Sequence, residues 1–252
     1  MPHTGICAHP FQVYPNLDAL SAAAAERWIA LCKTAIAERG AFHVALAGGS
    51  TPKRLYQLLA WPERRARIDW SRVHIYFGDE RAVPPTHADS NFRMAQEALL
   101  AHIDIPTENV QRMEATAEHI EQDAANYAAL LRKQLACDAA GMPVFDLILL
   151  GMGADGHTCS LFPDSPILEE RTHPVGSVYV ERLQSWRLSL TYPVLNAARQ
   201  LLFLVAGSDK APMLQRIWQG GTHADSVPVQ NIQPRGLVDW YLDAAAAAEL
   251  HS

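Results

Sequence analysis

The sequence lacks any closely spaced pair of cysteines and any pair of histidines at the spacing of a metal site. Its 4 cysteines, Cys7, Cys32, Cys137 and Cys159, stand far apart in the chain. This distribution provides no zinc motif and no dense disulfide framework. Because such cysteines are typical of a reducing compartment, we expect a cytoplasmic protein.

The chain also lacks a long apolar run, the pattern of a signal peptide in its N-terminal residues and an excess of positive charge. No apolar stretch approaches the ~20 residues needed to cross a bilayer. The N-terminal MPHTGICAHPFQVYPN has no basic segment followed by an apolar run, as a signal peptide would. The formal net charge of −6 argues against a nucleic-acid or anionic-membrane surface. We therefore expect no membrane and no nucleic-acid partner, and an anionic ligand would need a local cluster of basic side chains.

The composition is that of an ordinary globular protein, with 49% hydrophobic and 19% charged residues. No internal repeat or flexible linker divides the chain, so we expect a single domain over residues 1–252. Apolar runs predict strands at 42–48, 73–78, 145–151, 188–192 and 201–207, and helical patterns lie at about 17–39, 52–60, 89–101, 116–136 and 209–219. This alternation is typical of an α/β fold with a doubly wound, Rossmann-like, mostly parallel sheet flanked by helices. Because ligands bind such sheets beyond the carboxyl ends of the strands, the loops that follow the strands should carry the site.

The first of these loops has the sequence AGGSTP and precedes a helical pattern. Gly48 and Gly49 permit a sharp turn and a close approach of the backbone to a ligand. Ser50 or Thr51 is a good N-cap for the following helix, and the proline after them suits the first helical position. A helix N-terminus with free N–H groups suits a phosphate, although a tight turn with a capped helix fits the pattern equally well.

Two further loops carry charged residues directly after strands. In the segment GDER, Asp79 and Arg81 either face solvent, as strand-end charges usually do, or line a site. In the segment GSDK, an N-cap one or two residues before Lys210 would put this lysine in the first turn of a helix. The helix dipole disfavours a cation there, so a bound anion would explain Lys210 better than exposure to solvent does.

The loop GMGADGHTC, residues 151–159, has the G-x-G-x-x-G spacing of a dinucleotide-binding turn. That turn opens a long helix after the first strand of its sheet, whereas Pro163 and Pro166 allow at most about two helical turns here. The segment that follows the loop therefore argues against a dinucleotide-binding site. What remains is a glycine-rich turn in which His157 could act as a general base near neutral pH. Asp155 could then orient His157 or accept a hydrogen bond from a substrate.

Arg187 opens the apolar run LSLTY and could bind a phosphate through bidentate hydrogen bonds. A solvated arginine at the end of a strand would give the same pattern. The chain contains no G-x-S-x-G nucleophile elbow. Hydrolysis through an activated serine or through a metal ion therefore has no support in the sequence.

Four segments, taken in order, resemble the signature blocks of the 6-phosphogluconolactonases, within the larger glucosamine-6-phosphate isomerase/6-phosphogluconolactonase superfamily. They are ALAGGSTPKRLYQLLA, VHIYFGDERAVPPTHADSNFRM, DLILLGMGADGHTCSLFPDSP and LVAGSDKAPML, and the resemblance runs from about residue 10 to the C-terminal PRGLVDWYLDAAAA. It implies a modified doubly wound fold and hydrolysis of 6-phospho-D-glucono-1,5-lactone to 6-phosphogluconate, the second step of the oxidative pentose phosphate pathway. It also implies no metal or organic cofactor, and it allows a monomer or a homodimer.

The same resemblance implies roles for individual residues, which can be described by the part of the substrate that they would meet. The phosphate would be held by backbone and hydroxyl groups of one loop and by three basic side chains, and the sugar end would be lined by two aspartates. These residues are Gly48, Gly49, Ser50 and Thr51 for the loop, Arg81, Arg187 and Lys210 for the charge, and Asp79 and Asp155 for the sugar end. His157 would take a proton from the water that attacks the lactone carbonyl.

Two alternative functions stay open at this point. The amino-sugar isomerase/deaminase branch shares the GGSTP loop and the Asp-Gly-His turn, but its members carry an acidic residue five positions after the histidine, where this chain has Phe162. A sugar-phosphate-binding regulator would carry a helix-turn-helix and a basic surface, and only about ten residues precede the resemblance. Ala47 and Cys159 depart slightly from the lactonase blocks; we expect them to tune the site, and Cys159 could make it sensitive to thiol reagents.

Overall fold

The computed structural model describes residues 6, 9–219 and 227–250. A six-stranded sheet in the order β1-β9-β8-β5-β2-β3 runs through its centre, and all neighbouring strands in it are parallel. These strands are β1 (Phe11–Tyr14), β2 (Phe42–Leu46), β3 (Val73–Phe77), β5 (Leu147–Leu150), β8 (Gln200–Val205) and β9 (Leu237–Asp243). The α/β fold with a mostly parallel sheet is therefore confirmed.

A second, antiparallel sheet has three strands in the order β4-β7-β6, and they are β4 (Asp79–Arg81), β7 (Ser185–Leu190) and β6 (Val175–Val180). The strand predicted at 188–192 overlaps β7 of this sheet. The antiparallel pairing of β7 with β6 has a local reason, because only residues 181–184 connect the two strands. Such a short connection can join antiparallel strands only, since a parallel crossover needs a dozen or more residues.

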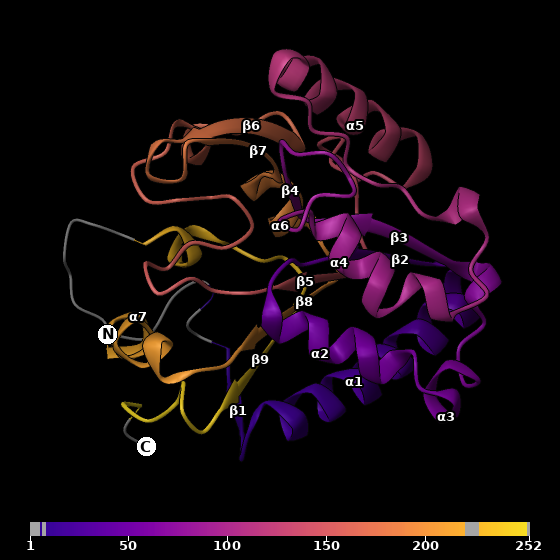
Figure 1. The fold of residues 1–252 in the computed structure, drawn as a ribbon, viewed down its shortest axis with the longest axis vertical. Helices are drawn as coiled ribbons and strands as arrows, with labels where there is room; N and C mark the ends of the chain where they lie inside the picture. The colour runs from indigo at the N-terminus through magenta and orange to yellow at the C-terminus, as the bar shows by residue number, and fades with distance from the viewer. Residues whose placement is uncertain (1–5, 7–8, 220–226, 251–252) are drawn as a thin grey trace.

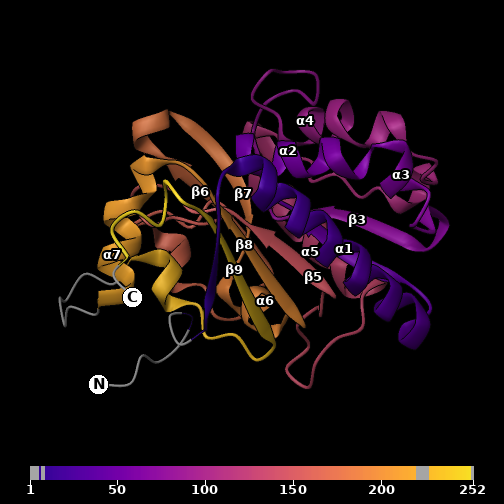
Figure 2. The ribbon, with the colours of Figure 1, turned by 90° about the horizontal axis from the view of Figure 1, so that it is seen from below.

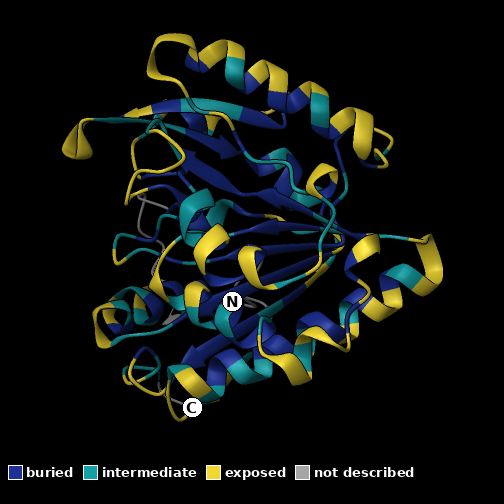
Figure 3. Cartoon of the chain, turned by 45° about the vertical axis from the view of Figure 1, so that its right-hand side comes forward, coloured by how far each residue is buried: buried dark blue, intermediate teal, exposed yellow. Residues whose placement is uncertain are grey.

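The helices are α1 (Leu17–Arg39), α2 (Ser50–Leu59), α3 (Pro62–Arg65), α4 (Asn91–Ala98), α5 (Ile120–Gln134), α6 (Tyr192–Ala197) and α7 (Ala211–Gln219). Helices α1 and α2 cover one face of the parallel sheet, and the antiparallel sheet lies over the other face with α5 on its outer side (Figures 1 and 2). Figure 3 shows buried central strands and helices whose exposed residues face outward. This arrangement removes the apolar strands from water on both faces, as parallel sheets require.

Helix α1 has the bounds that the sequence predicts, because both of its ends carry specific caps. The Asn16 side chain accepts a hydrogen bond from the Ala19 N–H at 3.0 Å. Gly40 ends the helix in a left-handed conformation, with φ of 83°, which glycine adopts without a steric cost.

The sequence did not predict β1 and β9, and the charged residues of β9 give a physical reason. Asp239 in β9 accepts a hydrogen bond from the Arg27 Nε at 2.7 Å, and Asp243 accepts one from the Gly207 N–H at 3.1 Å. These aspartates interrupt the apolar run by which a buried strand is recognised. Strand β1 is a short edge strand of four residues whose middle residues are exposed.

The path of the chain fixes where a ligand can bind. The chain passes from β2 outward to β3, then returns to the other side of β2 as β5 and continues to β8 and β9. The strand order therefore reverses between β2 and β5, and in such sheets the crevice at the carboxyl ends of these strands is the usual ligand site. Within the described ranges, no helix combines the length and the apolar character needed to cross a membrane.

Candidate active site

A pocket of about 250 Å³ lies at the carboxyl ends of β2, β5 and β8, and we call it the strand-end pocket. Its walls are the loop after β2, strand β4, the loop after β5, and the end of β8 with the turn that follows. The predicted site residues that line it are Gly48, Gly49, Ser50, Thr51, Asp79, Arg81, His157 and Lys210. Asp155 and Arg187 do not belong to this lining, although each lies directly behind a residue that does.

The glycine loop after β2 turns directly into helix α2. Gly49 has a φ of 99°, a conformation that only glycine adopts readily, and it occupies the N-cap position itself. The expected N-cap at Ser50 or Thr51 was therefore wrong, since α2 begins at Ser50 and has no side-chain cap. The hydroxyl groups of Ser50 and Thr51 are thus not used to cap α2, and the positive end of the helix dipole lies beside the pocket.

The loop before α2 is fixed by hydrogen bonds from Tyr56, and it packs closely against Asn91 because Gly48 has no side chain. The buried Tyr56 hydroxyl donates to the Ala47 carbonyl at 2.8 Å and accepts from the Ala47 N–H at 3.0 Å. A Cβ atom at Gly48 would lie 2.0 Å from the Asn91 Oδ1 atom, so no larger residue fits without displacing Asn91. The loop and the start of α4 are therefore packed in direct contact.

Asp79 is buried, and both of its carboxylate oxygens accept hydrogen bonds. Its Oδ1 atom accepts from the Asn91 Nδ2 at 3.0 Å, and its Oδ2 atom accepts from the Ser160 Oγ at 2.7 Å. These contacts fix the carboxylate in the pocket wall. The sequence did not predict either partner, because they lie 12 and 81 positions away and no local sequence pattern indicates these contacts.

The two charged neighbours of Asp79 serve different purposes. The buried Glu80 accepts hydrogen bonds from the Asn91 and Phe92 N–H groups, each at 2.8 Å, and thereby caps helix α4. Burial raises the pKa of Glu80, although these hydrogen bonds act in the opposite direction. Arg81 instead lines the pocket, where a guanidinium N–H donates to the Asp89 carbonyl. The segment GDER therefore combines a site with a helix cap.

Arg187 lies opposite Arg81 in the register of β7 and β4. The Nε atoms of both side chains are buried and have no hydrogen-bond partner within the described part of the chain. Burial, followed by the charge of Arg81, lowers the pKa of Arg187. Two adjacent cations with unmatched buried donors form a local basic cluster of the kind that an anionic ligand needs.

His157 lies on the turn after β5 and forms a short hydrogen bond with Asp155. The His157 Nδ1 and Asp155 Oδ1 atoms are 2.5 Å apart, and the His157 N–H also donates to Asp155 Oδ1 at 3.2 Å. A carboxylate accepts, so the Nδ1 atom carries the proton and the Nε2 atom of the neutral ring is left to accept one. A Cβ atom at Gly153 would lie 2.0 Å from His157 Nδ1, which explains a glycine at this position.

Several effects act on the ionisation of Asp155. Burial by itself would raise the pKa of this carboxyl group. The side-chain hydrogen bond and charge of His157, the His157 N–H and the charge of Arg182 outweigh burial, so the pKa lies well below its ordinary range. Asp155 is therefore ionised near neutral pH and can orient His157.

Two side chains near His157 are apolar or weakly polar. The buried Phe162 ring packs against the imidazole, with a centroid separation of 4.3 Å. Cys159 lines the strand-end pocket, and burial followed by the charge of Asp79 raises the pKa of its thiol. A raised pKa opposes formation of the thiolate, so it works against the expected sensitivity to thiol reagents.

Lys210 lines the pocket from the turn after β8. The expected first turn of an α-helix is a 3₁₀ turn, Ser208–Lys210, and α7 begins only at the next residue. The Lys210 Nζ atom lies 2.7 Å from the Asp209 Oδ2 atom. This ion pair involves an exposed carboxylate and leaves the other donors of the ammonium group for a ligand.

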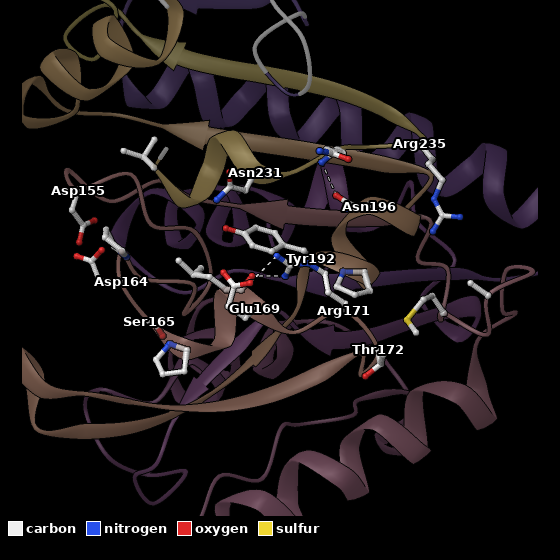
Figure 4. Close-up of a pocket in the computed structure, with 18 of the residues that line it drawn as sticks. Asp155, Asp164, Ser165, Glu169, Arg171, Thr172, Tyr192, Asn196, Asn231 and Arg235 are labelled. Atoms are coloured by element: carbon white, nitrogen blue, oxygen red, sulfur yellow. Dashed lines mark hydrogen bonds and ion pairs between the residues drawn. The ribbon is translucent and has the colours of Figure 1, made fainter. Parts of the chain in front are cut away.

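A wider groove of about 1500 Å³ lies on the other side of Asp155, and Figure 4 shows Asp155 at one end of it and Arg235 at the other. We call it the large groove. Two of its arginines are engaged with the protein: Arg171 hydrogen bonds to Glu169, and Arg235 forms an ion pair with Asp138. The strand-end pocket is smaller, yet among the residues that the structure describes it brings together a histidine, a helix N-terminus and basic side chains, which the large groove does not.

Within the described ranges, no three His, Cys, Asp or Glu side chains are grouped so that they could hold a metal ion. Cys32, Cys137 and Cys159 are free thiols. Cys7 lies outside the described residues.

Comparison with known proteins agrees with this geometry. The family model described as glucosamine-6-phosphate isomerases/6-phosphogluconolactonase matches residues 15–240. The chain is 38% identical to a 6-phosphogluconolactonase of a Nostoc species, over 95% of this chain and 97% of that protein. It is 43% identical to one from a Synechocystis species, over 86% and 88%.

Solved structures are similar over nearly the whole chain. A 6-phosphogluconolactonase from Trypanosoma brucei superposes with a TM-score of 0.84 at 29% identity, covering 96% of this chain and 99% of that one. A monomeric glucosamine-6-phosphate deaminase has a TM-score of 0.77 at 21% identity, covering 95% and 99%, which shows a shared fold alone.

Proposed function

This chain belongs to the glucosamine-6-phosphate isomerase/6-phosphogluconolactonase family, and we propose that its strand-end pocket is where it hydrolyses 6-phospho-D-glucono-1,5-lactone, with His157 as the general base. Curated relatives that share 38% and 43% of their residues with it over most of both chains are 6-phosphogluconolactonases. Its activity is accordingly lactone hydrolysis to 6-phosphogluconate, the second step of the oxidative pentose phosphate pathway. The residue roles below are our proposal.

The His157–Asp155 pair is the observation that carries the mechanism. With its Nδ1 atom bonded to Asp155, the neutral imidazole has its Nε2 atom available to take a proton from water as that water attacks the lactone carbonyl. The ring oxygen then leaves, and protonated His157 returns the proton to it. A lactone is already an activated ester, so a positioned base supplying ~10²–10⁴-fold suffices without a covalent intermediate.

The phosphate of the substrate would bind at the opposite side of the pocket from the base. Gly48, Gly49, Ser50 and Thr51 offer N–H and hydroxyl groups beside the N-terminus of α2, and Arg81, Arg187 and Lys210 offer positive charge. The buried unpaired donors of Arg81 and Arg187 support this role, because an anion would complete their hydrogen bonds. Asp79 would meet the sugar hydroxyl groups.

Phe162 separates this proposal from the amino-sugar deaminase alternative. Deaminases resemble this chain in the GGSTP loop and in the Asp-Gly-His turn, but they carry an acidic residue where Phe162 stands. Here the position holds an aromatic ring packed on the imidazole, so the proton relay of ring opening has no carboxylate at this point. The proposal also takes residues 1–252 as one lactonase domain of the cytoplasm that works without a metal ion or an organic cofactor.

The test is hydrolysis of freshly generated 6-phosphogluconolactone, measured above its spontaneous rate, for the wild type and for His157→Ala. We expect strong acceleration by the wild type and a loss of about 10²–10⁴-fold in kcat for the variant. EDTA should leave the wild-type rate unchanged.

His173→Ala is the matched control, because His173 is an exposed histidine that also contacts a carboxylate, with its Nδ1 atom 3.0 Å from Glu170 Oε2. This variant should keep the wild-type rate. Acceleration that survives in a folded His157→Ala would move the base to Asp155 or Asp79. No acceleration by the wild type would refute the lactonase function.

A further inference from the structure

Asp155 has a second partner on the side away from His157. Arg182 lies in the turn Glu181–Leu183 between β6 and β7, and its Nη2 atom is 2.5 Å from Asp155 Oδ2. The two oxygens of one carboxylate thus bind the base on one side and a guanidinium group on the other. No sequence pattern links these residues, which are separated by 27 positions.

Arg182 also contacts the aromatic ring that packs on the base. Its guanidinium carbon lies 5.0 Å from the centroid of the Phe162 ring, within the range of a cation–π contact. Asp155 and Phe162 both contact His157 directly. Arg182 contacts both of these residues, so it is linked to the histidine through each of them. The β6–β7 turn is thereby joined to the loop after β5 that carries Asp155 and His157, which we call the catalytic loop.

We propose that Arg182 is a positioning residue that holds Asp155 and Phe162 against His157 and sets the pH range in which His157 is an effective base. This inference rests on the proposed function of His157. Arg182 lies outside the lining of the strand-end pocket, so its effect is exerted through the residues that it holds.

The direction of the effect follows from charge. Asp155 favours the protonated, cationic form of His157, and the positive charge of Arg182 partly cancels the negative charge of Asp155. Without Arg182, His157 would hold its proton to a higher pH, so the neutral base would be scarcer at a given pH. At a separation of several ångströms near the surface, the loss of one charge corresponds to a shift of about half a pH unit.

The ion pair between Arg182 and Asp155 contributes little to the free energy of folding, so its effect on catalysis can be measured separately. The Arg182 side chain is 56% exposed, and exposed ion pairs contribute little to stability. A change in catalysis after substitution of Arg182 can therefore be separated from a change in folding by recording the thermal unfolding of each variant.

The experiment compares the wild type with Arg182→Ala and Arg182→Lys. Two quantities are recorded: the acid limb of kcat/KM against pH, and the titration of the His157 ring followed by NMR in the resting enzyme. In Arg182→Ala we expect both to move upward by about half a pH unit and kcat to fall several-fold, with KM nearly unchanged. Arg182→Lys keeps the charge and should restore the pH range, while the loss of the planar guanidinium group that contacts both Asp155 and Phe162 leaves kcat partly reduced.

Arg235→Ala is the matched control, because Arg235 is 58% exposed and pairs with Asp138 at 2.7 Å at the opposite end of the large groove (Figure 4). It should follow the wild type in both measurements. An acid limb and a His157 titration that are unchanged in Arg182→Ala would overturn the inference. Since the NMR titration needs no turnover, it tests Arg182 even if the wild type proves inactive on the lactone, a result that would refute only the proposed function.

Discussion

Arg81 and Arg187 are direct partners in the register of the antiparallel strands β4 and β7, so a second arginine lies next to the one that lines the strand-end pocket. Like charges in directly opposed positions destabilise a sheet. Their buried Nε atoms, which lack partners among the described residues, add the cost of unmatched donors. An anion bound between them would offset both costs, and we therefore expect the free enzyme to be stabilised by a phosphate-bearing ligand.

This relationship predicts the behaviour of Arg187→Met. The substitution keeps an unbranched side chain of similar length and removes the charge and the donors. We expect KM for the lactone to rise by about 10–100-fold with a smaller change in kcat, because a charge-assisted hydrogen bond to phosphate would be lost. The gain in Tm on adding 6-phosphogluconate should shrink in parallel.

Arg112→Met is the control for this prediction, since Arg112 is a surface arginine that pairs with Glu114 at 2.7 Å. Its KM and its ligand-induced change in Tm should match those of the wild type. If Arg187→Met binds the product as tightly as the wild type does, the paired arginines are not the phosphate site.

The sequence predicted the parts of the fold that depend on local patterns. Helix α1 has the predicted bounds, and in the structure both of its ends are set by local caps, Asn16 and Gly40. Strand β9 was missed because it contains the charged residues Asp239 and Asp243. Their carboxylates bind partners far along the chain, and the local sequence pattern does not reveal such partners. The antiparallel direction of β7 was not predicted, because strand direction depends on which strand pairs with it.

The same limit applies to the site. The glycine turns after β2 and after β5, the second of which carries His157, have recognisable spacing, so the sequence could identify them. The partners that fix Asp79 are Asn91 and Ser160, and only the fold brings them together with it. Arg182 was missed for the same reason, because its role depends on a turn that reaches the catalytic loop from another sheet.

A pair of stacked histidines at the other end of the sheet predicts a loss of stability in mild acid. His43 and His74 are partners in the register of β2 and β3, and their ring centroids lie 4.7 Å apart. Burial, followed by the charge of His74, lowers the pKa of His43 to about 4, while Asp146 acts in the opposite direction. Tyr76 is the other ionisable side chain in contact with the ring, with its hydroxyl group 3.2 Å from Nδ1.

The sign follows from linkage. The folded-state pKa of His43 lies below the ordinary value of 6.5, so the unfolded chain takes up the proton first as the pH falls. Stability is fully present above about pH 6.5 and declines towards pH 4. Because the ring is partly exposed, we expect a decline of about 1–2 kcal/mol in the free energy of unfolding from this group.

Urea unfolding at pH 7 and at pH 4.5 measures this effect. His43→Asn should lose less stability between the two pH values than the wild type does, by about 1–2 kcal/mol. His119→Asn, at an exposed position before α5, should behave like the wild type. Equal losses in wild type and His43→Asn would show that His43 does not make the stability depend on pH.

Gly153 and Gly151 offer a matched test of the loop after β5, because both line the strand-end pocket and they differ in what an added Cβ atom would meet. A Cβ atom at Gly153 would lie 2.0 Å from His157 Nδ1 and 2.5 Å from Asp155 Oδ1, whereas a Cβ atom at Gly151 would meet nothing within 4 Å. Gly153→Ala must therefore displace the His157–Asp155 pair. Since a misplacement of about 1 Å can cost ~10²-fold in rate, we expect kcat to fall by about that factor while KM changes little.

Gly151→Ala should keep the wild-type kcat, and both variants should unfold near the wild-type Tm because the displaced side chains are partly exposed. Kinetics with 6-phosphogluconolactone and thermal unfolding of the three proteins make the comparison. Loss of activity in Gly153→Ala alone would assign the effect to the histidine–carboxylate pair, because both substitutions remove the same backbone freedom. Full activity in Gly153→Ala would mean that the loop yields without moving the pair, and the orientation of His157 by Asp155 would then not limit the reaction.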